Sequence, residues 1–230
     1  MGMDEMFGWK NKASAMHRRT AETSGAYDGA YATITHGLMA GTRVASNLGW
    51  RPIEALTVGD KVLTFDNGMQ EITGIRRAVM WLDAPQSAEA MWPVIVPVGA
   101  LGNREPLTLL ADQGVLIESE AATDAFGDPF AVVPAAALDG VRGIYRAQPM
   151  QRVELIAIYF AQEEVIYAEG GAMLHCPADT STLDKFLDTP AQTYDVLSIR
   201  DAAFLMECLV VEDQMLATGG WTDGLERMAC

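Results

Sequence analysis

Short stretches in which apolar and polar residues alternate follow one another after position 40. Residues 42–46 alternate with a period of two, which predicts a strand, and Asn47-Leu48-Gly49 predicts the turn after it. Pro52 has no N–H to donate to a neighbouring strand, so the returning segment is predicted to lie at an edge of a sheet. The pattern therefore predicts a β-hairpin with one open edge.

A second hairpin is predicted around Asn67-Gly68. The turn signal at residues 57–60 precedes a strand at residues 61–65, and the partner strand is expected at residues 71–75. Asn-Gly between two strands favours a type I′ turn, because both central residues of that turn need a positive φ. Together the two hairpins favour an all-β domain of mainly antiparallel strands.

Polar and small residues dominate positions 1–36, where residues 10–19 can form a helix and residues 23–29 are typical of a linker. We therefore predict three parts of the chain. They are an N-terminal leader at 1–36, a domain at 37–210 that includes a closing helix, and a C-terminal tail at 211–230.

Two helices are predicted towards the C-terminal end. Residues 179–182 can cap a short helix at residues 183–187, which Pro190 ends. Asp195 or Ser198 can cap a longer helix. This longer helix is expected to run through Phe204, Cys208 and Val211, and its apolar stripe is expected to dock on the sheet.

Residues 41–68, reading GTRVASNLGWRPIEALTVGDKVLTFDNG, resemble the opening of a Hint domain, the fold of hedgehog autoprocessing domains and inteins. Further blocks that resemble this family follow in the same order. They are residues 96–103 with an A-L-G-N turn, 107–117, 130–138, 153–170 ending in A-E-G, and 197–205. The resemblance implies an all-β, mainly antiparallel fold, the horseshoe of Hint domains, with short terminal helices.

The resemblance also implies where self-cleavage chemistry would lie. In this family a nucleophile attacks the peptide bond before it, and a histidine polarises that amide and protonates the leaving nitrogen. The nucleophile position here is Gly37, and the histidine position is Gln113. Two further family histidines correspond to Ala157 and to Glu163 or Glu164.

These departures predict that self-cleavage has been lost and that the protein acts as a binding or structural module. Residual autoproteolysis or splicing-type processing at the bond before Gly37 is the alternative.

Other residues are candidates to replace the nucleophile and the histidines that the family has. Thr35 and His36 combine a hydroxyl with an imidazole, but neighbours in an extended segment point to opposite faces. His175-Cys176 is half of a metal or thiol pair, and we predict a loop histidine and a half-buried thiol. Paired carboxylates are predicted to be solvated surface, namely Glu163, Glu164, Asp223 and Glu226. The sequence thus predicts no catalytic residue, no metal site and no cofactor.

The composition of the chain limits the classes of partner and the compartment that can be expected. The chain of 230 residues is 50% hydrophobic, enough for one sizeable core, and its net charge of −15 argues against nucleic acid or an anionic membrane as partner. No run approaches the ~20 apolar residues of a membrane span. Three cysteines without a disulfide framework and an N-terminus without a Sec signal favour the cytoplasm, with leaderless export as the alternative. An unidentified protein is the expected partner.

Overall fold

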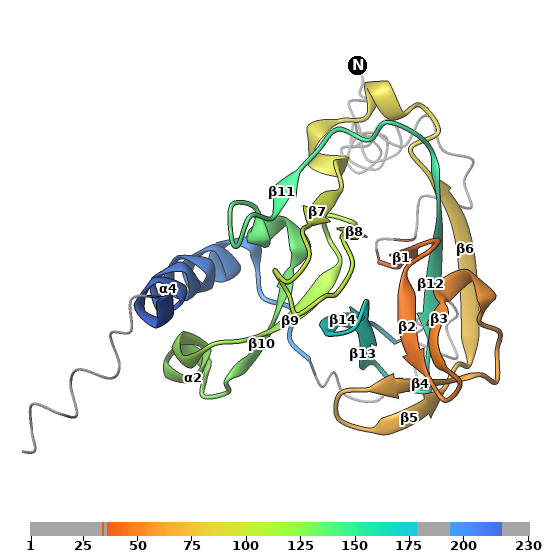
Figure 1. Cartoon of the computed structure of the whole chain (residues 1–230), viewed down its shortest axis with the longest axis horizontal. Coiled ribbons are helices and arrows are strands. Elements are labelled where there is room, and N and C mark those ends of the chain that lie inside the picture. Colours follow the sequence, from red (N-terminus) through yellow and green to blue (C-terminus); the bar gives the residue numbers. More distant parts are fainter. Residues whose placement is uncertain (1–33, 35, 179–193, 218–230) are drawn as a thin grey trace, which may run out of the picture. The chain divides into compact units, whose positions relative to one another are not determined.

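The computed structural model describes residue 34 and residues 36–178 and 194–217. Strands form most of the regular structure there, and the predicted mainly antiparallel all-β fold is confirmed (Figure 1). The predicted helices at residues 10–19 and 183–187 and the predicted tail after residue 217 lie outside the described residues.

Six strands form the first sheet, and each pairs with its neighbours in antiparallel fashion. In spatial order they are β11 (Tyr145–Arg146), β7 (Val94–Val96), β8 (Leu107–Leu109), β1 (Leu38–Met39), β12 (Val153–Tyr159) and β6 (Gly74–Met80). The short strand β1 therefore lies in the interior of this sheet, between β8 and β12.

Eight strands form the second sheet, again with antiparallel neighbours. Seven follow one another as β10 (Phe130–Pro134), β9 (Gly114–Glu118), β14 (Ala172–Cys176), β13 (Glu164–Ala168), β2 (Arg43–Ser46), β4 (Lys61–Thr64) and β5 (Gly68–Glu71). The eighth, β3 (Gly49–Pro52), pairs only with β2. This agrees with the edge position that Pro52 predicts.

Four short 3-10 helices connect the strands, namely η1 (Ile53–Ala55), η2 (Ala84–Gln86), η3 (Glu89–Met91) and η4 (Ala135–Leu138). Two α-helices are described, α2 (Glu120–Phe126) and α4 (Ile199–Ala217). The position of α2 in the middle of the chain was not predicted. Its N-cap is Ser119, whose hydroxyl accepts a hydrogen bond from the Ala121 N–H.

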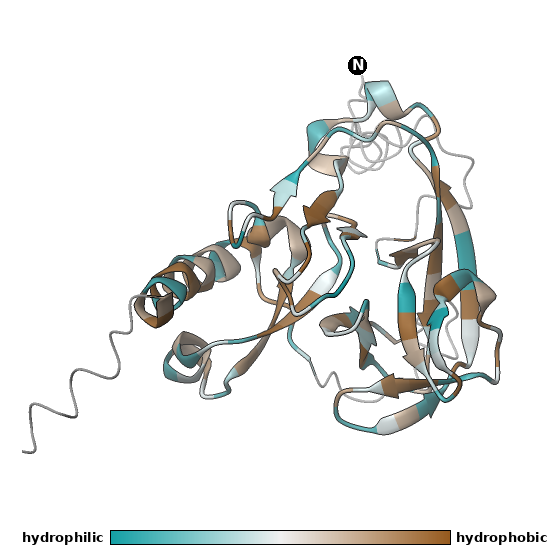
Figure 2. Ribbon diagram, viewed as in Figure 1, coloured by the Kyte–Doolittle hydropathy of each residue, from teal (hydrophilic) through white to brown (hydrophobic). Residues whose placement is uncertain are grey.

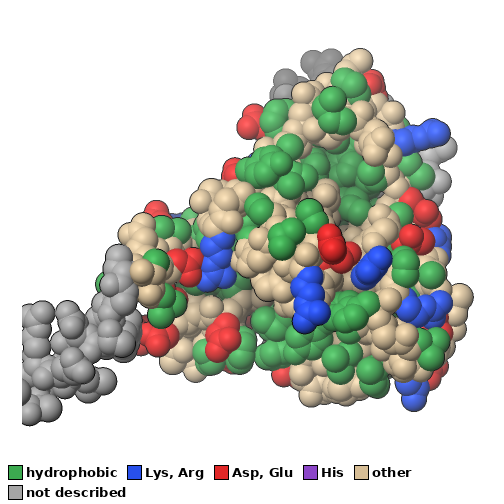
Figure 3. Space-filling model, in the orientation of Figure 1, with side chains coloured by type: hydrophobic (Ala, Val, Ile, Leu, Met, Phe, Trp, Pro, Cys, Tyr) green, Lys and Arg blue, Asp and Glu red, His purple; other side chains and the backbone are tan. Residues whose placement is uncertain are grey.

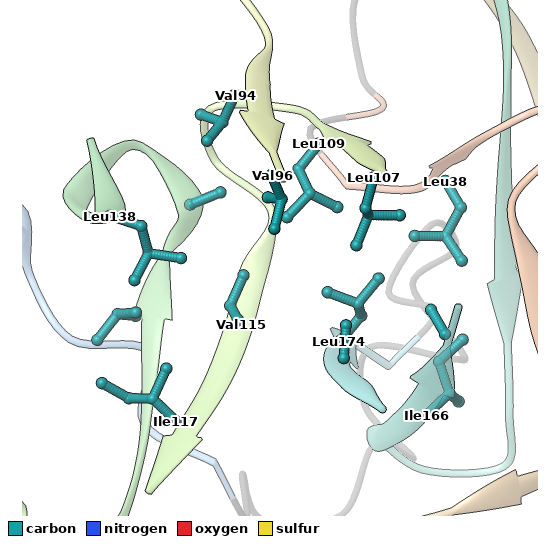
Figure 4. Close-up of a cluster of buried hydrophobic side chains, with 14 of the residues drawn as sticks. Leu38, Val94, Val96, Leu107, Leu109, Val115, Ile117, Leu138, Ile166 and Leu174 are labelled. Carbon is teal, nitrogen blue, oxygen red and sulfur yellow. The ribbon is translucent and has the colours of Figure 1, made fainter. Parts of the chain in front are cut away.

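Both sheets contribute to one hydrophobic core (Figure 4). Leu38, Val96 and Leu107 come from the first sheet, whereas Val115 and Leu174 come from the second. Their close packing removes apolar surface from water, which is the main stabilising term of a fold of this size. The core therefore fixes β1 and the start of β9 relative to each other.

Helix α4 packs on η4, α2 and β10. Ser198 caps it, as predicted, by accepting from the Asp201 N–H. The helix and its docking on the sheet are confirmed, but Phe204 and Val211 are exposed, and the buried side chains that dock lie on another face. Those buried side chains are Ala202, Leu205, Met206 and Leu209. Figure 2 shows both hydrophobic and hydrophilic residues along this helix, so its apolar pattern alone does not identify the docked face.

The hairpin at Asn67-Gly68 is confirmed, but its turn differs from the prediction. Thr64 pairs with Gly68 across the hairpin, so the loop has three residues. Gly68 has φ +66°, whereas Asn67 is not among the residues with positive φ. A three-residue loop closed by a glycine in the left-handed region is the second common hairpin type, and it replaces the predicted type I′ turn.

Residues 153–170 resemble a late hairpin of the family, with two apolar strands on either side of a polar turn, and this expectation is the second correction. Both predicted strands exist, as β12 and β13, yet they do not pair with each other. Strand β12 pairs with β1 and β6 in the first sheet, and β13 pairs with β14 in the second. The polar residues between β12 and β13 therefore form a crossing from one sheet to the other.

No helix in the described part of the chain combines the length and the hydrophobicity that a membrane crossing requires.

Candidate functional site

Gly37 lies directly before β1 and is buried against β12. Its φ of +140° is a conformation that residues with a side chain rarely adopt. A Cβ at this position would lie 3.1 Å from both the Ile156 carbonyl oxygen and Leu155 Cγ. Neither the backbone conformation nor the surrounding space is suited to a nucleophilic side chain here.

Gln113 lies in the turn before β9, and its side chain is only 1% exposed. Its Oε1 accepts a hydrogen bond from the Gly37 N–H at 2.9 Å. Its Nε2 donates to the carbonyl oxygens of Gly114 and His175, at 3.0 and 2.7 Å. The fold thus brings the two predicted site positions, 37 and 113, into direct contact.

The three hydrogen bonds define what Gln113 can do. An amide nitrogen carries two protons, and both are directed at backbone carbonyls. The amide does not titrate near neutral pH, so it transfers no proton to a leaving nitrogen. Gln113 therefore ties β1, the start of β9 and β14 together.

The two further positions at which the family has histidines lie on different elements. Ala157 is a buried residue in the middle of β12, opposite Arg76 of β6. Glu163 precedes β13 and is also buried, so its prediction as solvated surface is wrong. Its Oε2 lies 3.1 Å from His175 Nε2, and its Oε1 accepts from the Tyr194 N–H at 2.9 Å.

His175 was predicted to lie in a loop. It is instead the fourth residue of β14. It is 5% exposed and packs against the Tyr194 ring, with the two ring centroids 5.7 Å apart. It also touches the Gln113 segment, since a Cβ added to Gly114 would lie 2.9 Å from His175 Cβ. A buried imidazole with a carboxylate partner therefore lies beside Gln113.

Glu164 is fully buried, which overturns its prediction as surface as well. Its carboxylate accepts from Asn67 Nδ2 at 3.1 and 3.0 Å and from Gln162 Nε2 at 3.2 Å. Near it, the Tyr194 hydroxyl donates to the Asp66 carboxylate. Buried carboxylates need such donors, because an unpaired buried charge is strongly unfavourable.

Cys176 follows His175 and is buried rather than half-buried. Burial, aided by the nearby Glu164 carboxylate, raises the pKa of the Cys176 thiol to about 12. Only the thiolate is a nucleophile, so Cys176 is unreactive at neutral pH. It does not supply the nucleophile that position 37 lacks.

Residues upstream of Gly37 give no second catalytic pair within the described chain. Thr35 lies outside the described residues. His36 packs edge-on against Tyr159, with ring centroids 5.4 Å apart. No group of three or more metal-ligating side chains occurs in residues 36–178 and 194–217.

Residues His175 and Tyr194 were missed as members of this site. The alternation of AMLHC after the A-E-G turn predicts a strand, and that signal could have placed His175. Its contact with Tyr194 depends on how the chain returns from a distant segment, which no local pattern encodes.

The His175 imidazole makes stability depend on pH. Burial lowers the pKa of His175, and the hydrogen bond and the charge of Glu163 oppose that effect. In the unfolded chain a histidine binds a proton near pH 6.5, whereas folded His175 stays neutral to lower pH. Below about pH 6.5 the unfolded state therefore binds more protons, and the free energy of unfolding is expected to fall as the pH falls.

Urea unfolding at about pH 7.5 and about pH 5.5 tests this, with His175→Gln as the matched variant. Glutamine can still donate to Glu163, and the other two histidines are unchanged. We expect the unmodified protein to lose more stability between the two pH values than the variant. Equal losses of stability in the two proteins would show that His175 does not contribute to the pH dependence.

Residues 36–173 match the Hint domain family. No curated protein matches the chain.

Several solved structures of inteins and intein-like domains are similar. A splice-inactive, GSH-linked variant of the AceL NrdHF class 3 split intein is 13% identical, with a TM-score of 0.42, and the match covers 63% of this chain and 99% of that one. The intein-like domain from Clostridium thermocellum is 12% identical, with a TM-score of 0.44, and covers 62% and 99%. The gp41-1 intein is 14% identical, with a TM-score of 0.39, and covers 60% and 97%.

Proposed function

The chain belongs to the Hint domain family, and we propose that this member has lost self-cleavage at the bond before Gly37 and works as a binding or structural module. The observation that carries the proposal is the contact between Gly37 and Gln113. The two family positions meet in the fold, but one has no side chain and the other has no titratable proton.

An acyl shift at this bond needs an attacking group and a proton for the leaving nitrogen. Gly37 supplies no attacking group, and the wall formed by Leu155 and Ile156 leaves little space for one. Both Nε2 protons of Gln113 already serve backbone carbonyls. With the chemistry gone and the core intact, the remaining role of such a fold is to hold a surface in place for another molecule.

The partner of such a module is a protein rather than a nucleic acid. A net charge of −15 repels polyanions, and this electrostatic term dominates non-specific binding to nucleic acid. The cytoplasm is the proposed location, because three cysteines without a disulfide framework are typical of a reducing compartment.

Residual self-processing at the same bond is the second candidate function. The observation that favours it is the buried imidazole of His175, whose backbone carbonyl accepts from Gln113. Burial lowers the pKa of this imidazole, so it is a poor proton donor at neutral pH. Without a side chain at position 37, water would have to attack the bond directly.

Incubation of the purified protein with a strong thiol, followed by measurement of its intact mass, separates the two candidates. A thiol releases an acyl intermediate as a thioester, so self-processing would give a fragment that begins at Gly37. We expect the full-length mass of 24.9 kDa to persist. Cleavage by a contaminating protease gives scattered cut sites instead, and a protease inhibitor suppresses it.

A further inference from the structure

A groove with a volume of about 490 Å³ lies beside the His175–Glu163 pair. Its volume falls in the range of about 300–1,000 Å³ that is usual for ligand sites. Tyr194 forms part of its wall, and the Tyr194 ring also packs on the His175 ring. Neither Gly37 nor Gln113 lines the groove, which is therefore separate from their contact, although its residue Leu116 belongs to β9, the strand that follows Gln113.

The floor of the groove is apolar and aromatic. Leu116 and Val132 belong to a small buried cluster, and Phe65 and Phe130 pack on that cluster. The rings of Phe65 and Phe130 are 4.9 Å apart in an edge-to-face arrangement. Phe126, at the end of α2, adds a side chain that is 47% exposed.

The rim of the groove is acidic. Asp66, Asp128 and Asp195 line it and are all exposed, and no lysine or arginine is among the described residues that line it. Two of these aspartates are held in place, because Asp66 accepts from the Tyr194 hydroxyl and Asp128 accepts from the Phe130 N–H at 2.8 Å. On the face drawn in Figure 3, hydrophobic patches have both acidic and basic side chains beside them.

One wall of the groove is the outer strand of the second sheet. Strand β10 pairs with β9 on one side only. On its other side Val196 forms a single parallel bridge to Val132, and the Leu197 N–H donates to the Val132 carbonyl at 2.8 Å. A short stretch of extended chain therefore already lies along β10, which shows that its edge accepts a polypeptide backbone.

From these features we infer that the groove binds a polypeptide segment of a partner in which an aromatic or large aliphatic side chain stands next to lysine or arginine. This inference rests on the proposed binding function and names its partner chemistry. The apolar side chain enters between Phe65, Phe126 and Phe130, where it loses contact with water. The flanking cations lie against the rim aspartates, which no basic residue of the described lining neutralises.

Two pentapeptides test the apolar part of this chemistry, acetyl-RKFKR-amide and acetyl-RKAKR-amide, with acetyl-EDFDE-amide as the charge-reversed probe. Each is titrated into the full ¹⁵N-labelled chain, and backbone amide shifts are followed. We expect the phenylalanine peptide to bind about 10-fold or more tightly than the alanine peptide, because burial of a phenylalanine side chain is worth that factor. Raising the salt concentration from about 0.05 M to about 0.3 M is expected to weaken binding of the phenylalanine peptide. The acidic peptide is expected not to bind.

Two variants and two matched controls locate the site. Phe126→Ser removes an exposed ring and Asp195→Asn removes a rim charge, and neither side chain makes a hydrogen bond to another described residue that the fold needs. We expect roughly 5-fold weaker binding for each. Met150→Ser likewise replaces an exposed apolar side chain by serine, and Asp112→Asn likewise removes an exposed carboxylate charge. Both positions lie outside the groove lining, and both variants are expected to bind as the unmodified protein does. Thermal unfolding verifies that all four are folded.

Several results would overturn the inference. Equal binding of the phenylalanine and alanine peptides, or of the basic and acidic peptides, contradicts the stated chemistry. Shift changes outside residues 65–66, 116, 126–132 and 194–197 contradict the location. Phenethylamine binding as tightly as the pentapeptide would assign the groove to small aromatic cations instead. The intact mass of the same sample keeps the two proposals apart, since a fragment beginning at Gly37 contradicts the loss of self-cleavage whatever the peptides do.

Discussion

Replacing Gln113 with leucine is expected to lower the free energy of unfolding by about 3–5 kcal/mol. Leucine has nearly the volume of glutamine, so packing changes little. The variant, however, leaves the buried Gly37 N–H without an acceptor and removes a donor from the Gly114 and His175 carbonyls. Each buried polar group left unsatisfied costs about 1–3 kcal/mol, and the two carbonyls keep a second lone pair, which places the sum at the lower end.

Gln148→Leu is the matched control. Gln148 makes one exposed hydrogen bond, to the Pro85 carbonyl, and its loss is expected to change stability by no more than about 0.5 kcal/mol. Denaturant unfolding of both variants measures the difference. A Gln113→Leu effect as small as that of Gln148→Leu would mean that Gln113 is not the link between β1, β9 and β14.

Replacing Gly37 with cysteine restores the family nucleophile but is expected to destabilise the protein without causing cleavage. The φ of +140° costs a residue with a side chain about 1–3 kcal/mol, and the contacts at 3.1 Å with β12 add to that. Gly99→Cys is the control, because Gly99 also has a positive φ, +85°, but nothing lies within 4 Å of its added Cβ. The difference between the two variants measures the β12 wall together with the cost of φ +140° over φ +85°.

Adding Gln113→His to Gly37→Cys is the smallest reconstruction of the active family pattern. General acid–base assistance contributes about 10²- to 10⁴-fold, so we expect at most slow, thiol-stimulated cleavage from the double variant and none from either single variant. An imidazole cannot replace the three hydrogen bonds of Gln113, and the double variant is expected to be the least stable of the three. Fast cleavage by Gly37→Cys alone would show that the scaffold itself activates the bond.

The positions of the turns were predicted most reliably from the sequence, because the residues that form a turn interact with near neighbours in the chain. The turn at residues 57–60 was predicted, and it is held by the Asp60 carboxylate, which accepts from the Thr57 N–H at 2.9 Å. The A-L-G-N turn was recognised from the family resemblance, and the buried Asn103 closes it through the Leu101 N–H and the Pro97 carbonyl. In both, the bonding partners lie within six residues of each other, so the sequence alone contains the interaction.

Contacts between distant strands could not be predicted in the same way. Glu163 and Glu164 look like surface residues in an acidic chain, and only the pairing of β13 with β14 and the return of Tyr194 bury them. The crossing of the chain between the two sheets, after β12, has the same sequence pattern as a hairpin. Gly37 and Gln113 were identified by resemblance, whereas their hydrogen bond follows from sheet packing.

The most direct measurement of the central claim is cell-free synthesis of the chain with one tag at each end. Synthesis in this form also detects cleavage that would be complete before a protein could be purified. The account predicts a single product that carries both tags and persists over hours. A C-terminal product that begins at Gly37, formed equally in the presence of protease inhibitors, would contradict it.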